Sequence, residues 1–288
     1  GSSAGAILQA LALAVGTGLY LPFVRIARRL RMTANAGAMR TLVMASESDE
    51  VVHGHRLIEL PGTAGHLANV LARDLTDALG SADRLFLQYQ PQVCVEECRV
   101  FGVEALLRWD HEIYGLIPPS VTVALAEDMR IVDRLGEYVL RLACRQRSAW
   151  AASVPGDLIV SVNVSPLQLQ DADFDRKVLG ILAEENLDPH LVELEITEST
   201  SLAPAVQAIG ALLRLRNAGV RIALDDFGMG HTSLHYLREL PLDTLKIDRS
   251  LTFTSQGDLN EHVIRSIVAL SRTLGLRAVV EGIEQPEQ

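Results

Sequence analysis

The chain has 288 residues, of which 48% are hydrophobic and 22% charged, and its formal net charge at pH 7 is −10. Residues 1–46 carry +5, which leaves −15 for the rest, and such an acidic body is a poor binder of nucleic acid polymers. The three cysteines include one C-x3-C pair with no second pair to complete a zinc site, so we expect reduced structural thiols. No glycine-rich nucleotide motif occurs.

The first segment reads as a membrane helix with a basic flank, residues 1–31. The stretch Ala6–Val24 has 19 residues without a charge, and about 20 apolar residues cross a bilayer. Four arginines follow it, which is the charge excess expected on the cytoplasmic side: Arg25, Arg28, Arg29 and Arg31. A signal peptide would carry its positive charge before the apolar run. The alternative is a buried or amphipathic helix, broken by two glycines and a proline.

Residues 32–67 are rich in Ala, Gly and Ser and read as a linker, and the main domain is predicted from residue 68 to residue 288. In that domain, five short apolar stretches end in an oxygen-bearing side chain or a lysine, and a sixth run begins with one. These residues are Glu104, Asn163, Glu195, Asp225 with Asp226, Lys246 and Glu281.

The spacing of these polar residues predicts a repeated strand–helix unit. Successive members lie 59, 32, 30, 21 and 35 residues apart, and one strand with its crossover helix takes about 30 residues. In a closed parallel barrel all strands end on one face, so we expect the polar residues to converge there.

Convergent carboxylates predict a metal site, because ionised carboxylates repel one another unless a cation compensates. Oxygen ligands select Mg²⁺ or Mn²⁺, whereas zinc would bring His or Cys into the set. The adjacent Asp225 and Asp226 can each bind a different ion, as in two-metal phosphoryl chemistry. We interpret His231 and His235, near this loop, as surface or capping residues, because the oxygen ligands already satisfy the ions.

Lysine is rare in this chain, since only Lys177 and Lys246 occur among 26 Lys and Arg residues. Lys246 lies near the end of the apolar stretch Leu242–Ile247, where a compact ammonium can hold a water or a phosphate oxygen. The alternative is a lysine that snorkels to the surface, for which this stretch leaves little room. Another apolar group, Leu212, Leu213 and Leu215, is expected to pack in the core.

Seven short motifs occur in order within residues 68–288. They are Tyr89-Gln90-Pro91, Glu104-Ala105-Leu106-Leu107-Arg108-Trp109, Asn163-Val164-Ser165, Glu195-Ile196-Thr197-Glu198-Ser199, Asp225-Asp226-Phe227-Gly228, Lys246-Ile247-Asp248 and Glu281-Gly282-Ile283-Glu284. In this order they resemble the EAL family of bacterial cyclic di-GMP phosphodiesterases. Each motif alone is weak, but seven in register form a specific match.

The resemblance implies an α/β fold, a TIM-like (β/α)8 barrel, and metal-dependent hydrolysis of cyclic di-GMP to linear pGpG. It implies two Mg²⁺ or Mn²⁺ ions. Glu104, Asn163, Glu195 and Asp225 match the ligands of the first ion, and Asp225, Asp226 and Glu281 match those of the second.

The remaining matched positions imply roles in catalysis and substrate binding. Lys246 matches the residue that orients the attacking water, Glu281 one that helps to take its proton, and Glu198 one that steadies the loop after Asp226. Three residues match positions that hold the dinucleotide: Gln90, Leu106 and Arg108. The planar fork of an arginine suits a phosphate.

Two departures from the family pattern affect the expectations. Met229 and His231 replace a threonine and an aromatic residue in the loop that links metal occupancy to dimerisation, so a homodimer is left open. The chain stops at Gln288, before the family's last strand–helix segment, so we expect a C-terminally incomplete barrel in part of a longer protein.

Residues 5–23 also resemble the last membrane segment of a phosphotransferase-system sugar permease.

Hydrolysis of cyclic di-GMP is favoured, because every checked ligand position keeps its residue. The alternative is a receptor that binds cyclic di-GMP without cutting it and signals to the membrane segment. A metal-dependent lyase or aldolase is a more distant third, and no diguanylate cyclase motif occurs. With the basic flank, the expected location is the cytoplasmic face of the bacterial inner membrane.

Overall fold

The computed structural model describes residues 64–80, 84–95, 97–154, 156–197, 206–228, 234–252 and 257–283. The predicted membrane helix (1–31), most of the predicted linker, Glu198, Met229 and His231 lie outside these residues. Within the described ranges, no helix is both long enough and apolar enough to cross a membrane. The boundary between two compact units falls between Val160 and Ser161.

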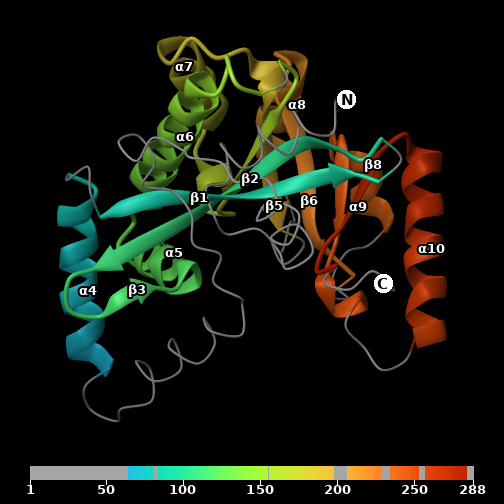
Figure 1. Ribbon diagram of the computed structural model, residues 1–288. Coiled ribbons are helices and arrows are strands. Elements are labelled where there is room, and N and C mark those ends of the chain that lie inside the picture. The colour runs from blue at the N-terminus through green and yellow to red at the C-terminus, as the bar shows by residue number, and fades with distance from the viewer. Residues whose placement is uncertain are drawn as a thin grey trace, which may run out of the picture. The chain divides into compact units, whose positions relative to one another are not determined.

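The first unit is built on a long antiparallel hairpin (Figure 1). Its elements are α4 (Ala64–Ala78), β1 (Leu85–Cys94), β2 (Arg99–His111), β3 (Gly115–Ile117), α5 (Pro119–Asp128) and α6 (Val132–Ala149). Helix α4 begins inside the segment predicted as linker. β2 also pairs with β3 after a turn at residues 112–114, and Gly115, the first residue of β3, has a φ of 70° that suits glycine. Cys144 is buried on α6, Cys94 is partly buried and Cys98 is exposed, and none of the three forms a disulfide in the described residues.

The β1–β2 hairpin has one apolar face, because side chains alternate along each strand. Leu87 and Tyr89 on β1 lie opposite Leu107 and Ala105 on β2, and all four are buried. The intervening residues share the other face, where Gln90 lies opposite Glu104. Glu104 therefore lies within a 13-residue strand rather than at a strand end, because pairing with β1 extends β2 on both sides of it.

The second unit repeats strand and helix in the way that the spacing predicted. After β4 (Ile159–Val164), which crosses the unit boundary, come α7 (Phe174–Glu184), β5 (Val192–Thr197), α8 (Val206–Asn217), β6 (Arg221–Phe227), α9 (Leu234–Glu239), β7 (Thr244–Ile247), α10 (Gly257–Leu274) and β8 (Arg277–Val280). Short 3₁₀ turns cover Gln168–Gln170, Pro189–Leu191 and Arg249–Leu251. The strand order is β4-β5-β6-β7-β8, and the pairs from β5 to β8 are parallel. This is the α/β architecture expected of a barrel-type fold.

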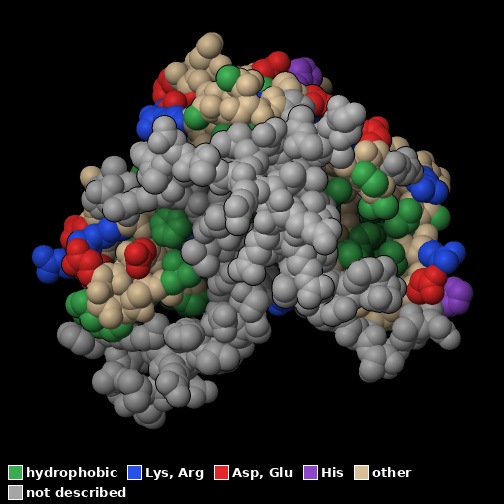
Figure 2. All heavy atoms as spheres, in the orientation of Figure 1, with side chains coloured by type: hydrophobic (Ala, Val, Ile, Leu, Met, Phe, Trp, Pro, Cys, Tyr) green, Lys and Arg blue, Asp and Glu red, His purple; other side chains and the backbone are tan. Residues whose placement is uncertain are grey.

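Burial divides the strands of the second unit into a core and an edge. β5 and β7 are buried almost throughout, although polar and apolar residues alternate along both, so both faces of these strands are covered. All four residues of β8 are partly exposed, and Figure 2 shows hydrophobic side chains at the surface beside α10. Leu212 and Leu215 on α8 are buried, but Leu213 is 43% exposed. The prediction for Leu213 was wrong, because the helical period turns it away from the face shared by the other two.

Candidate active site

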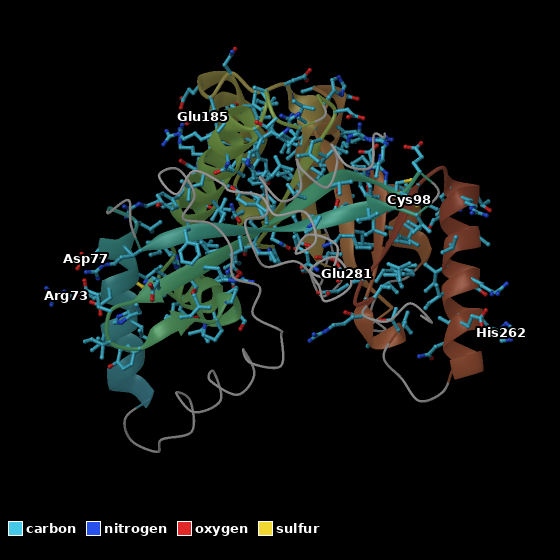
Figure 3. The ribbon with its side chains drawn as sticks, in the orientation of Figure 1. Arg73, Asp77, Cys98, Glu185, His262 and Glu281 are labelled. Atoms are coloured by element: carbon cyan, nitrogen blue, oxygen red, sulfur yellow. The ribbon has the colours of Figure 1, made fainter. Side chains whose placement is uncertain are left out.

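Four carboxylates and one lysine of the second unit lie within two residues of the carboxyl ends of consecutive parallel strands. Glu195 is in β5, Asp225 and Asp226 are in β6, and Lys246 is in β7. Glu281 directly follows β8 (Figure 3), and its backbone N–H donates to the carbonyl of Ile247 at 3.0 Å. The strands thus bring together residues that are up to 86 positions apart in the sequence.

Lys246 is the centre of this cluster. Its Nζ lies 2.8 Å from Oε2 of Glu195, 3.0 Å from Oδ2 of Asp225 and 2.9 Å from Oε1 of Glu281. The lysine side chain is 2% exposed and that of Glu195 is fully buried, while Glu281 is 27% exposed. Lys246 therefore does not snorkel to the surface. It holds three strand ends in a fixed relation, and its charge is needed because buried carboxylates without a cation are costly.

An irregularity in β6 allows two consecutive carboxylates to reach the site. The register between β6 and β7 shifts between Leu224 and Phe227, and Asp226 has a φ of 57°. Because neighbouring side chains of a regular strand point to opposite faces, such a bulge re-aims one of them. The backbone N–H of Asp226 donates to Oδ1 of Asp225 at 2.9 Å, which fixes the turn.

Carboxylate oxygens of Asp225, Asp226 and Glu281 lie within 4.8 Å of one another, and the three side chains could hold a metal ion. With Glu195, the cluster has four carboxylates against the single ammonium of Lys246, so negative charge is in excess. All four offer hard oxygen ligands, which suit Mg²⁺ or Mn²⁺. The residues present therefore fit the divalent cations that the sequence predicted.

Gly228 ends the irregular segment and makes it possible. Its φ is 114°, and a Cβ atom at this position would lie 2.7 Å from Cδ1 of Leu251. A side chain there would strain the backbone and force the Leu251 side chain to move. The glycine of the Asp225-Asp226-Phe227-Gly228 motif thus has a steric reason that the sequence alone did not give.

The first unit places the other predicted residues on one face of its hairpin. Gln90, Glu104, Leu106 and Arg108 occupy alternate or opposite positions in the register of β1 and β2. Their side chains accordingly share a face, as residues that contact the same ligand should.

Within the second unit, Asn163 is an exposed residue of β4. The role predicted for Glu198 concerns a residue outside the described ranges.

Gln88 was not predicted from the sequence as a site residue, although it contacts one. Its Oε1 accepts a hydrogen bond of 2.7 Å from Nε of Arg108, and Nη1 of Arg108 donates to the carbonyl of Leu107 at 2.9 Å. Both side chains are buried, so the guanidinium is held in one orientation. The signal was present in the sequence, because Gln88 lies two residues before Gln90 and therefore on the same face of β1.

Residues 72–288 match the EAL domain family. The chain belongs to the EAL domain family. It is 41% identical over 219 residues to the bifunctional diguanylate cyclase/cyclic di-GMP phosphodiesterase MucR of Pseudomonas aeruginosa, covering 76% of this chain and 32% of MucR. It is 36% identical over 219 residues to the cyclic di-GMP phosphodiesterase PA2567 of the same organism, covering 75% of this chain and 37% of PA2567.

The same family appears among solved structures. A cyclic di-GMP complex of the MucR phosphodiesterase superposes with a TM-score of 0.68 at 39% identity, covering 74% of this chain and 88% of that one. This EAL chain spans about a third of the length of the curated relatives that it matches. The match over residues 72–288 confirms the family assignment made from the seven motifs. The resemblance of residues 5–23 to a permease segment stays a prediction, as does a location at the inner membrane.

Proposed function

We propose that this EAL chain hydrolyses cyclic di-GMP to linear pGpG with the help of two Mg²⁺ or Mn²⁺ ions. The observation that carries the proposal is the convergence of Glu195, Asp225 and Glu281 on the Nζ atom of Lys246, with Asp226 beside them. These are the residues that the family resemblance named as ligands and as the water-orienting lysine. The named phosphodiesterases among its relatives support the same activity.

The hydrolysis adds water to one phosphodiester of the ring. A water oxygen attacks phosphorus, the bond from phosphorus to the 3′ oxygen breaks, and the product carries a 5′ phosphate and a 3′ hydroxyl. Divalent cations held by Asp225, Asp226 and Glu281, with Glu195 and the predicted ligands Glu104 and Asn163, would lower the pKa of the water and offset the charge of the phosphate.

The protein's own side chains supply position and proton transfer. The ammonium of Lys246 fixes the three carboxylates around it with its three N–H donors. It would orient the attacking water with the donor that is released when one of these carboxylates turns to a cation. Glu281 is the most exposed carboxylate that contacts Lys246, and its carboxylate can accept the proton that the water loses.

Substrate binding is assigned to the hairpin face of the first unit. Arg108 presents a planar guanidinium suited to two phosphate oxygens, and Gln88 fixes its orientation through the Nε hydrogen bond. Gln90 and Leu106, on the same face, contact the dinucleotide. These contacts rest on the family resemblance together with the shared face.

The test is chromatographic detection of pGpG after incubation of the full chain with cyclic di-GMP and Mg²⁺. Asp225→Asn should lower kcat more than about a hundredfold, because it removes one charge from the metal-binding set. The asparagine keeps an oxygen that can accept from the N–H of Asp226, so the local fold should persist. Asp188→Asn makes the same chemical change at an exposed 3₁₀ cap and is the matched control.

A full rate of hydrolysis in Asp225→Asn would refute the assignment of the site. Tight binding of cyclic di-GMP by the unmodified chain, with no pGpG at any Mg²⁺ or Mn²⁺ concentration, would instead favour the receptor alternative. Calorimetric titration with cyclic di-GMP in the presence of a chelator measures that binding separately from turnover.

A further inference from the structure

A second polar layer lies directly beneath the acid–lysine cluster of the second unit. Ser161 Oγ donates to Oε1 of Glu193 at 3.0 Å, and Thr244 Oγ1 donates to Oε2 of Glu193 at 2.6 Å. Ser161 is 0% exposed, and Glu193 and Thr244 are each 1% exposed. Each oxygen of a buried carboxylate thus accepts from a hydroxyl on a different strand. We call this group the hydroxyl–carboxylate layer.

Each member of the layer lies two residues before a predicted site residue. Ser161 precedes Asn163 on β4, Glu193 precedes Glu195 on β5, and Thr244 precedes Lys246 on β7. Because side chains two apart on a strand point to the same side and rise by about 6.6 Å, the layer and the cluster are stacked. The bond between Glu193 and Thr244 in the layer therefore runs parallel to the ion pair between Glu195 and Lys246 above it.

These two contacts join strands that are not neighbours. β6 lies between β5 and β7 and pairs with both, so the contacts must pass over a β6 residue. Ala223 occupies that place, since it is in register with Glu195 on one side and with Thr244 on the other. Its side chain is a single buried methyl group, which leaves space for a glutamate to reach across.

Backbone pairing alone fixes β5 against β6 and β6 against β7, and the β6–β7 register is irregular at the site. A direct contact between β5 and β7 bypasses that irregularity. We propose that Glu193 is a positioning residue, which sets β4 and β7 at the height where Lys246 meets Glu195 and where the metal ligands converge. The expected fall in kcat rests on the proposed function. A catalytic geometry must be held to within about half an ångström, which is why one buried contact matters.

The test compares two pairs of matched variants. Thr244→Val removes the hydroxyl donor to Glu193 without changing the shape of the side chain. Thr122→Val makes the same change at a fully buried Thr of α5, whose hydroxyl donates to the carbonyl of Pro118, the residue before that helix. Ser161→Ala is compared in the same way with Ser271→Ala, a buried serine that donates to Ile267 on α10.

Three quantities are measured for each variant: the midpoint of urea unfolding, kcat and KM for cyclic di-GMP, and the affinity for Mn²⁺ by calorimetry. We expect Thr244→Val and Ser161→Ala to lower the unfolding midpoint more than their controls, because each leaves one oxygen of the buried Glu193 carboxylate without its donor. Only Thr244→Val and Ser161→Ala should lower kcat, by about tenfold to a hundredfold, as a misplacement of the order of 1 Å does. The same two variants should weaken Mn²⁺ binding several-fold.

A triple variant separates positioning from stability. Glu193→Met with Ser161→Ala and Thr244→Val removes the buried carboxylate together with both donors, so no polar group is left unsatisfied and stability should recover. We expect kcat and Mn²⁺ affinity to stay low in this variant. Their recovery would overturn the inference, and so would equal values of kcat in Thr244→Val and Thr122→Val.

If the chain does not hydrolyse cyclic di-GMP, the positioning role of Glu193 can still be tested. If the unmodified chain makes no pGpG, the kinetic comparison is lost, but the Mn²⁺ titration still reports on the geometry of the ligands. A selective loss of Mn²⁺ affinity in Thr244→Val and Ser161→Ala would then support the positioning role without the hydrolase, and equal affinities across both pairs would overturn it.

Discussion

Replacing Lys246 by methionine should destabilise the protein far more than the same replacement at its only other lysine. The ammonium of Lys246 lies within 3.0 Å of three carboxylates and is almost fully buried. Lys177 also has an ion pair, 2.8 Å from Nζ to Oδ2 of Asp171, but its side chain is 40% exposed. The two lysines therefore differ in burial, whereas the contact distances are alike.

The expected magnitudes follow from that difference. Two unit charges about 3 Å apart attract by roughly 5 kcal/mol at an effective dielectric constant of about 20, before the cost of desolvation is subtracted. Removing one partner from a buried ion pair costs about 3–5 kcal/mol, because the other charge stays buried without compensation. Removing one partner of an exposed pair costs about 0–1 kcal/mol. Lys246→Met should thus lose about 3–5 kcal/mol, and Lys177→Met less than about 1 kcal/mol.

Urea unfolding followed by circular dichroism measures both losses under metal-free conditions. Added Mg²⁺ should recover part of the stability of Lys246→Met, because a cation among the remaining carboxylates replaces the lost charge, and should leave Lys177→Met unchanged. Equal losses in the two variants would refute the reasoning, since they would show that the three carboxylates do not depend on the ammonium of Lys246.

Three further predictions concern turnover, substrate affinity and pH. Lys246→Arg keeps the charge but should lose most of kcat, because the larger planar guanidinium cannot occupy the place of a compact ammonium between the carboxylates; an arginine variant with unchanged kcat would contradict this. Gln88→Met should raise KM for cyclic di-GMP about tenfold with little change in kcat, because it removes the hydrogen bond that holds Nε of Arg108. A hydrogen bond to a charged group contributes about 1.5–3 kcal/mol. An unchanged KM would show that Gln88 does not orient Arg108. The bidentate hydrogen bonds from Arg214 hold the pKa of the buried Asp175 carboxyl below its usual value, so this carboxylate stabilises the fold above its unfolded pKa of about 3.9, and the contribution is lost as pH falls through the lower folded pKa. Asp175→Asn should therefore lower the midpoint of urea unfolding at pH 7. The difference in midpoint between this variant and the unmodified protein should become smaller at acid pH. Glu261→Gln, at an exposed ion pair on α10, is the control and should change the midpoint little.

The sequence by itself determined the family and the repeat of strands and helices. Apolar stretches that end in Glu195, Asp225, Lys246 and Glu281 were recognisable because strand burial and polar strand ends are local patterns. Their order and residue types carried the EAL resemblance, and hard oxygen ligands indicated divalent cations. These properties depend on neighbours in the chain, so they can be read without coordinates.

Only the tertiary structure decided what these residues contact. That Lys246 pairs with three carboxylates, that the bulge in β6 turns Asp226 toward the site, and that Gln88 holds Arg108 all depend on strand register. Glu193 is the clearest case, because its two hydroxyl partners lie 32 and 51 positions away. A periodic pattern tells which side of a strand a residue faces, but the pairing of strands distant in sequence sets which side chains meet across the interior.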